Sequence, residues 1–337
     1  MKVALTYNLR PMSATGSALP DDTYVEWDEP ATIAAVQTAL AAAHEVVLIE
    51  DNDELTARLR ASAPDIVFNM AEGLNGPDRE ARLPALLERW NIPFTGSSSR
   101  TLRTCLDKAA TKRVLQQHGL PTPAHAVVYH THTVPALPEF PLIVKPLHEG
   151  SSKGIADASV VYTPAALQRR VAHVLETYHQ PALVETFLRG REFTVALLGN
   201  SPEITVLPLV EICFTALPPG AAPLYSYAAK WLWDTPQQPR DVLRCPAEIP
   251  ADLARTIADV CCRAFVALEC RDWCRIDVRL DAQGQPQILE LNPLPGIAPD
   301  PASHSCFPTA AAAAQISYPA LIRRVLSHAG QRYGLIV

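Results

Sequence analysis

Residues 274–296 read CRIDVRLDAQGQPQILELNPLPG, and this stretch says more about the fold than any other. Two apolar runs flank a polar, glycine-containing turn, which predicts a β-hairpin. Side chains alternate between the two faces of a strand, so Arg275 and Asp277 share one face, and Glu290 and Asn292 share one face of the return strand. A tight turn then places Asp277 beside Glu290.

The hairpin predicts a magnesium site. Asp277, Glu290 and Asn292 offer two carboxylates and an amide oxygen, which are the ligands that Mg²⁺ prefers. Mg²⁺ at such a site normally bridges nucleotide phosphates. The alternative is a solvated hairpin face with alternating charges, which the alternation alone would favour. The loop at residues 293–296 favours a site, because its backbone N–H groups can reach a ligand.

A second stretch, KPLHEGSSKG at residues 145–154, follows an apolar strand. Its glycines permit unusual dihedrals, and Ser151, Ser152 and the backbone amides can surround a phosphate. Lys145 ends the strand, where its charge can reach a phosphate oxygen. The stretch contains neither GxxxxGK[ST] nor GxGxxG, and a flexible loop is the alternative.

Three further residues are candidates for nucleotide contacts. Lys108 stands at the start of a predicted helix, residues 107–119, and its alternative is a surface lysine. Glu185 ends a strand and Glu192 follows Gly190. Either glutamate can accept hydrogen bonds from an adenine or a ribose, although isolated glutamates prove nothing.

Alternating strands and helices in the first third predict an α/β fold with a parallel, doubly wound sheet. The expected strands there are residues 3–7, 46–49, 66–70 and 92–95, and the expected helices are 28–40 and 83–90. A Ser/Thr cluster at 95–99 then marks a boundary. Later strands are predicted at residues 141–145, 182–185, 193–198 and 203–212, and later helices at 163–177, 250–268 and 318–328.

The composition is that of a globular chain, with 337 residues, 48% hydrophobic residues and a net charge of -6. This charge does not favour nucleic acid or a membrane surface as a partner, and no apolar run is long enough to span a bilayer. The first residues are too short and polar for a secretory signal, so the expected location is cytoplasmic. The eight cysteines contain no CxxC pair and are expected to be small buried hydrophobes.

Several motifs together resemble the ATP-grasp superfamily, and specifically the D-alanine–D-alanine ligase family. The resemblance runs from about Asp65 almost to the C-terminus. The motifs occur in the family's order: IPFTGSSSRTLRTCLDKAATK, PLIVKPLHEGSSKG, ALVETFLRGREFTVALLG, CRIDVRLDAQGQPQILELNPLPG and, more loosely, SHSCFP. The resemblance implies a three-domain ATP-grasp architecture, α/β and in part α+β, with domains at residues 1–98, 99–187 and 188–337. ATP would lie between the second and third domains.

The resemblance also implies a role for each matching residue. For ATP it implies Lys108 and Lys145 at the phosphates with Ser151 and Ser152 in the loop, Glu185, Thr186, Phe187 and Leu188 at the adenine, and Glu192 at the ribose. For metal it implies Asp277, Glu290 and Asn292, holding Mg²⁺ or alternatively Mn²⁺. For catalysis it implies Arg275 and the Gly296 backbone at the oxyanion, Lys230 in a closing loop with Ser151 beneath it, and Ser305 at the second substrate's carboxylate.

The chain departs from the family around the first substrate. The family's N-terminal glutamate signature is missing, and Glu26, Asp28 or Glu29 could replace its glutamate. Trp231 stands where the family has a lid tyrosine, so the tyrosine's hydroxyl link to Ser151 is not expected. The loop at 297–304 is longer than usual. These changes alter the amino-acid pocket, and D-alanine is expected to be a poor substrate.

Three functional hypotheses follow. The favoured one is an ATP-dependent ligase that joins a carboxylate to an amine through an acyl-phosphate, with amino-acid or dipeptide substrates. The second is D-alanyl-D-alanine synthesis for the cell wall. The third is a non-catalytic ATP-binding module, against which Arg275 argues, because mere binding does not need an oxyanion residue. A homodimer is the expected assembly.

Overall fold

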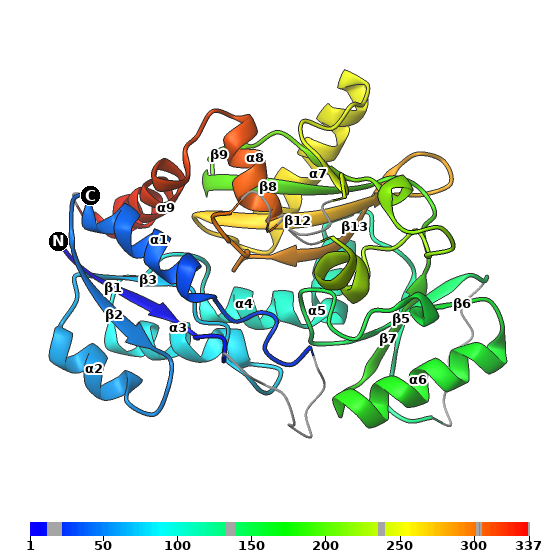
Figure 1. The fold of residues 1–337 in the computed structure, drawn as a ribbon, viewed down its shortest axis with the longest axis horizontal. Helices are drawn as coiled ribbons and strands as arrows, with labels where there is room; N and C mark the ends of the chain where they lie inside the picture. Colours follow the sequence, from blue (N-terminus) through cyan, green and yellow to red (C-terminus); the bar gives the residue numbers. More distant parts are fainter. Residues whose placement is uncertain (12–21, 132–138, 235–239, 301–302, 304, 336–337) are drawn as a thin grey trace.

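The computed structural model describes residues 1–11, 22–131, 139–234, 240–300, 303 and 305–335. These residues form three separate sheets, and helices cover them (Figure 1). No helix in these ranges is long and apolar enough to cross a membrane. The division into domains at residues 98 and 187 stays a prediction, although each predicted domain contains one of the three sheets.

The first sheet is parallel, with strand order β2-β1-β3. Its strands are β1 (Lys2–Tyr7), β2 (Glu45–Glu50) and β3 (Ile66–Asn69). The helices that follow them are α1 (Pro30–Ala41), α2 (Leu55–Ser62) and α3 (Arg79–Trp90). Side chains of α1 pack on one face, and those of α2 and α3 pack on the other. The predicted doubly wound parallel sheet is confirmed, but the strand expected at 92–95 is only an isolated bridge between Val67 and Phe94.

The second sheet is antiparallel, with strand order β4-β7-β5-β6. Its strands are β4 (His125–Val128), β5 (Leu142–Pro146), β6 (Val160–Val161) and β7 (Ala182–Thr186). Helix α6 (Pro164–Tyr178) begins where the Thr163 hydroxyl accepts a hydrogen bond from the Ala166 N–H, and proline occupies its first turn. The apolar face of α6 packs on this sheet, as Leu167, Val171 and Val174 are buried against it.

The third sheet is also antiparallel, with the path β11-β10-β8-β12-β13. Its strands are β8 (Glu192–Asn200), β9 (Glu203–Val206), β10 (Val210–Ile212), β11 (Leu243–Arg244), β12 (Trp273–Leu280) and β13 (Pro286–Asn292). Strand β9 pairs with β8 beside the main path. The run predicted as one strand at 203–212 is therefore two strands, β9 and β10, which pair with different parts of β8. Helix α7 (Ala251–Ala267) buries its apolar face on this sheet.

Two helices between the first and second sheets pack mainly on the third. They are α4 (Ser99–Leu106) and α5 (Lys108–Gln117). Cys105 and Leu115 from these helices lie in the same buried cluster as α7. The sequence analysis did not predict α4, because the serines at its start indicated a loop. One of these serines, Ser98, is the helix cap, since its hydroxyl accepts a hydrogen bond from the Thr101 N–H.

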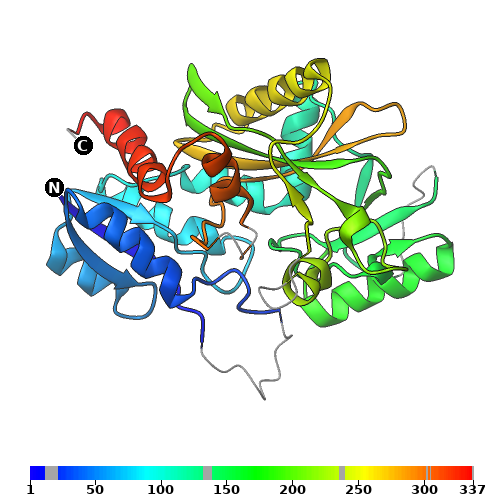
Figure 2. The same ribbon diagram turned by 45° about the horizontal axis from the view of Figure 1, so that its top comes forward.

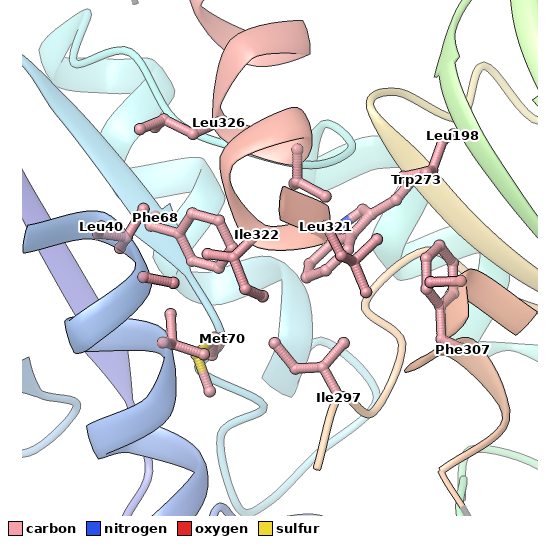
Figure 3. Close-up of a cluster of buried hydrophobic side chains, with 14 of the residues drawn as sticks. Leu40, Phe68, Met70, Leu198, Trp273, Ile297, Phe307, Leu321, Ile322 and Leu326 are labelled. Carbon is pink, nitrogen blue, oxygen red and sulfur yellow. The ribbon is translucent and has the colours of Figure 1, made fainter. Parts of the chain in front are cut away.

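The C-terminal helices return to the first sheet (Figure 2). They are α8 (Cys306–Ala313) and α9 (Tyr318–Tyr333), the second five residues longer than predicted. In Figure 3, Leu321 and Ile322 of α9 lie beside Phe68 of β3 and Trp273 of β12, whose ring centres are 5.8 Å apart. One continuous core thus joins the first and third sheets, and it fixes the walls of the space between them. The remaining short turns are Asp157–Ser159, Phe214–Ala216 and Ala229–Trp233.

Candidate active site

The β12–β13 hairpin has the predicted register, with Asp277 opposite Glu290 and Arg275 opposite Asn292. Arg275 donates from Nε to one Asp277 oxygen at 3.2 Å and from a terminal nitrogen to the other at 3.0 Å. Asn292 Nδ2 lies 3.2 Å from the same carboxylate. An irregularity after Asp277 shifts the pairing by one residue, but the two carboxylates stay side by side.

The two carboxylates differ in electrostatic environment. Burial raises the pKa of Asp277, and the neighbouring Glu290 adds to this effect. Burial would also raise the pKa of Glu290, but Lys108 and Lys145 lower it to about 2. The Lys108 ammonium lies 3.5 Å from Glu290. Glu290 therefore stays ionised beside Asp277, whose carboxyl group is harder to ionise. A cation bound beside both carboxylates would stabilise their negative charge.

The donor set fits Mg²⁺ better than a closed metal site. In the described ranges, no three His, Cys, Asp or Glu side chains gather as a metal-binding group. Asp277 and Glu290 are two carboxylates, and Asn292 adds one amide oxygen. Mg²⁺ usually takes one or two carboxylates and completes its shell with water and substrate phosphates. The few protein ligands would leave coordination positions open, which suits a metal ion that binds together with a nucleotide's phosphates.

Lys145 and Glu185 pair with each other inside the second sheet. The Lys112 ammonium lies 2.9 Å from the other Glu185 oxygen, so the carboxylate is held between two lysines. Burial would raise the pKa of Glu185, but Lys112 and Lys145 lower it to about 2. The Glu185 carboxylate pairs with Lys145, and its expected role at the adenine stays a prediction. The sequence analysis did not single out Lys112, because no motif around this lysine predicts that it is buried beside Glu185.

The segment after Glu185 contributes Thr186, Phe187 and Leu188 to the wall of a cavity. Lys145, Asp277 and Glu290 line the same cavity. Phe187 is buried, and the guanidinium of Arg279 lies 4.8 Å from its ring centre. Arg279 also pairs with Glu192 at 3.1 Å. The predicted ribose acceptor Glu192 therefore already has one cationic partner, which keeps its carboxylate oriented.

The phosphate-loop candidate folds as a tight turn. Ser151 and Ser152 both have left-handed backbone conformations, with φ of 49° and 62°. The Ser152 hydroxyl donates to the Tyr225 carbonyl at 2.8 Å, which ties the loop to the segment before Lys230. Trp231 Nε1 donates to the Ser151 carbonyl at 3.1 Å. The Trp231 indole thus links the segment at residues 229–233 to the loop at residues 145–154, where the resemblance implied a tyrosine hydroxyl.

Glu26, a candidate for the first substrate's ammonium, is engaged within the protein. It lies 2.9 Å from Arg79 and 3.3 Å from Lys153, and its side chain is buried. Burial would raise the pKa of Glu26, but these two cations lower it to about 2. Two counter-ions already neutralise Glu26, and its role at the first substrate's ammonium stays a prediction. Sequence reasoning missed Arg79 because it lies at the start of α3, far from Glu26 along the chain, and only the fold brings it close.

Gly296 and Ser305 lie close together at the C-terminal wall. The Ser305 hydroxyl donates to the Gly296 carbonyl at 2.9 Å. This bond ties the loop after β13 to the start of α8 across the long insertion. Of that longer loop, Pro301, Ala302 and His304 lie outside the described residues.

All of the candidate residues line one cavity, which the three sheets surround. They are Glu26, Lys108, Lys145, Ser151, Ser152, Glu185, Thr186, Phe187, Leu188, Glu192, Lys230, Trp231, Arg275, Asp277, Glu290, Asn292, Gly296 and Ser305. The sequence predicted the members of this group but not their distances, and their individual roles stay predictions. Burial lowers the pKa of Lys230 in this cavity, with nearby Arg275 adding to the effect.

A parallel N-terminal sheet, two antiparallel sheets and a cavity lined by lysines and a carboxylate hairpin define the ATP-grasp class of proteins. The family model described as D-ala D-ala ligase C-terminus matches residues 114–327. This chain belongs to the D-alanine–D-alanine ligase family. The superfamily and family expected from the sequence are both confirmed.

Two relatives and one solved structure are similar to this chain. An uncharacterized protein, y4sG, from Sinorhizobium fredii is 40% identical over 299 residues, covering 86% of this chain and 84% of that protein. A D-alanine–D-alanine ligase from Bordetella avium is 37% identical, covering 82% and 81%. The D-alanine–D-alanine ligase from Bacillus anthracis complexed with ATP has a TM-score of 0.72 at 22% identity, covering 99% of both chains. The last match shows the shared fold.

Proposed function

We propose that this protein is an ATP-dependent ligase that joins a carboxylate to an amine through an acyl-phosphate. The observation that carries the proposal is the hairpin register, which sets Asp277 and Glu290 beside Arg275 in a cavity that Lys108 and Lys145 also line. Phosphoryl transfer depends on positioning and on charge stabilisation more than on a protein nucleophile. The cavity supplies negative carboxylates that would hold a metal ion and positive lysines that would contact phosphate oxygens.

Each group has a part in this chemistry. Asp277, Glu290 and Asn292 would hold Mg²⁺, which would neutralise phosphate charge when bound. Lys108 and Lys145 would bind phosphate oxygens, and Glu185 would hold Lys145 in place.

The second half of the reaction needs an oxyanion site and the exclusion of water. Arg275 and the Gly296 N–H would stabilise the oxyanion that forms when the amine attacks. The lid residues Lys230 and Trp231, tied to Ser151, would shield the acyl-phosphate from water.

The substrates are small molecules, and we propose amino acids or dipeptides. Relatives are D-alanine–D-alanine ligases, so D-alanine belongs in any test. D-Alanine is expected to be a poor or merely acceptable substrate, because Glu26 is already paired and Trp231 replaces the tyrosine. A homodimer in the cytoplasm completes the proposal, and sedimentation would test the assembly.

The function is tested by ADP release. Purified protein with ATP and Mg²⁺ is assayed against D- and L-amino acids, singly and in pairs, and against dipeptides. Mass spectrometry identifies the products. ADP release that depends on an amino acid, with a condensed product, is the expected result. Absence of a product across the panel, with ATP still bound, would instead favour a non-catalytic ATP-binding module.

The Lys145→Ala substitution is expected to raise the KM for ATP and to lower kcat, by about tenfold each or more. It removes the charge that Glu185 holds toward the cavity and leaves Glu185 with Lys112 alone. Steady-state ADP release over a range of ATP concentrations measures both parameters. Exposed Lys2→Ala is the control, and unchanged ATP kinetics in Lys145→Ala would mean that this lysine is only structural.

A further inference from the structure

Two carboxylates on the cavity wall are without a counter-ion in the described part of the chain. Asp28 follows the loop before α1, and Glu72 follows β3. Both line the cavity, and neither side chain forms a hydrogen bond or an ion pair with a described residue. Burial raises the pKa of Asp28 to about 8 and that of Glu72 well above its usual value.

Hydrogen bonds tie the backbones of these two residues to the same residue, Asn8. The Asn8 side-chain oxygen accepts from the N–H groups of Glu72 and Gly73, at 2.9 and 2.8 Å. The Asn8 carbonyl accepts from the Asp28 N–H at 2.9 Å. Trp27 Nε1 donates to the Gly73 carbonyl at 3.0 Å. Asn8 itself is buried, so it joins the two segments that carry Asp28 and Glu72 and keeps their backbones close together.

The cations near Asp28 and Glu72 already form ion pairs with other carboxylates. Arg79 pairs with Glu26 at 2.9 Å and lies 3.7 Å from Glu80. Lys153 pairs with Glu149 at 2.6 Å as well as with Glu26.

The remaining cations of the wall also have partners. Arg10 pairs with Glu29, and Lys108 lies 3.5 Å from Glu290. The wall therefore has more carboxylates than cations, and the excess is at Asp28 and Glu72. A buried carboxylate without a partner is costly, so this wall is suited to a ligand that brings positive charge.

We propose, building on the ligase function, that one substrate is an amino acid with a cationic side chain, whose two cationic groups pair with Asp28 and Glu72. An ordinary amino acid brings one ammonium and would leave the other carboxylate unpaired. A basic amino acid such as lysine, ornithine or arginine brings two. A site built around a buried polar partner strongly rejects the analogue that lacks it, so this wall acts as a specificity filter.

The test compares lysine, ornithine and arginine with norleucine, a neutral analogue of lysine, using both enantiomers of each. In wild-type protein, kcat/KM for the best basic amino acid is expected to exceed that for norleucine by about 100-fold. In Glu72→Gln and Asp28→Asn, this ratio is expected to fall by about tenfold or more. Glu203→Gln, a matched change on exposed β9, should leave the ratio unaltered.

A second measurement does not depend on turnover. Calorimetric titration of the same amino acids into protein with Mg²⁺ and a non-hydrolysable ATP analogue reports binding directly, and circular dichroism checks that each variant is folded. Norleucine matching the basic amino acids in wild type, or a preference unchanged in both carboxylate variants, would overturn the inference. Carboxylate-dependent binding of a basic amino acid without ADP release would support the inference while refuting the ligase function.

Discussion

Replacing Asp277 with asparagine is expected to lower kcat by about 10³-fold, since a metal at this position supplies several kcal/mol of charge stabilisation. Asp277 accepts two hydrogen bonds from Arg275 and lies opposite Glu290, so its loss disturbs both the metal position and the arginine. The substitution keeps the shape of the side chain and removes only the charge. ADP release with a saturating substrate pair measures the effect.

The matched control is Asp259→Asn, on the exposed side of α7, where the carboxylate lies 3.6 Å from Arg263. This variant should retain wild-type turnover. Glu290→Gln should reproduce the loss seen in Asp277→Asn, because both carboxylates belong to one site. Melting temperatures close to wild type would show that the loss is not due to unfolding. Wild-type turnover in Asp277→Asn would refute the metal assignment and with it the main support for the proposed mechanism.

Replacing Asp272 with alanine is expected to destabilise the protein by about 3–5 kcal/mol, the usual cost of breaking a buried ion pair by removing one partner. Asp272 is fully buried and pairs with Arg332 of α9 at 2.6 Å. It also accepts from the Gly96 N–H at 2.8 Å and from Asn200 Nδ2 at 2.9 Å. One carboxylate thus joins the segment before α4, the third sheet and the last helix, and its removal leaves the partly buried Arg332 guanidinium without its counter-ion.

Urea unfolding, followed by circular dichroism and by tryptophan fluorescence, measures this change. The control is Asp252→Ala, whose carboxylate pairs with Arg255 on the surface of α7 and should contribute little. Asp272→Asn should be intermediate, because the amide keeps an acceptor but loses the charge. Equal unfolding midpoints for wild type and Asp272→Ala would mean that the three parts of the molecule are held together without this junction.

Local patterns predicted the elements that build the active site. The alternation around Asp277 and Glu290 indicated strands, and the tight turn between them determined which residues face each other. The three strands and two of the helices of the N-terminal sheet followed from periodicity. Where a helix began with a serine, at Ser99, the same local rules failed, because a helix cap and a loop use the same residues.

The sequence by itself determined the fold class, the family and the membership of the cavity wall, because these depend on short motifs and on hydrophobic periodicity. Only the tertiary structure decided which charges are paired. Glu26 meets Arg79, and Glu185 meets Lys112, through contacts between residues far apart along the chain or on different elements. Coulomb interactions depend on distance in space, so no pattern along the chain reveals that Asp28 and Glu72 are left without a described counter-ion while their neighbours are neutralised.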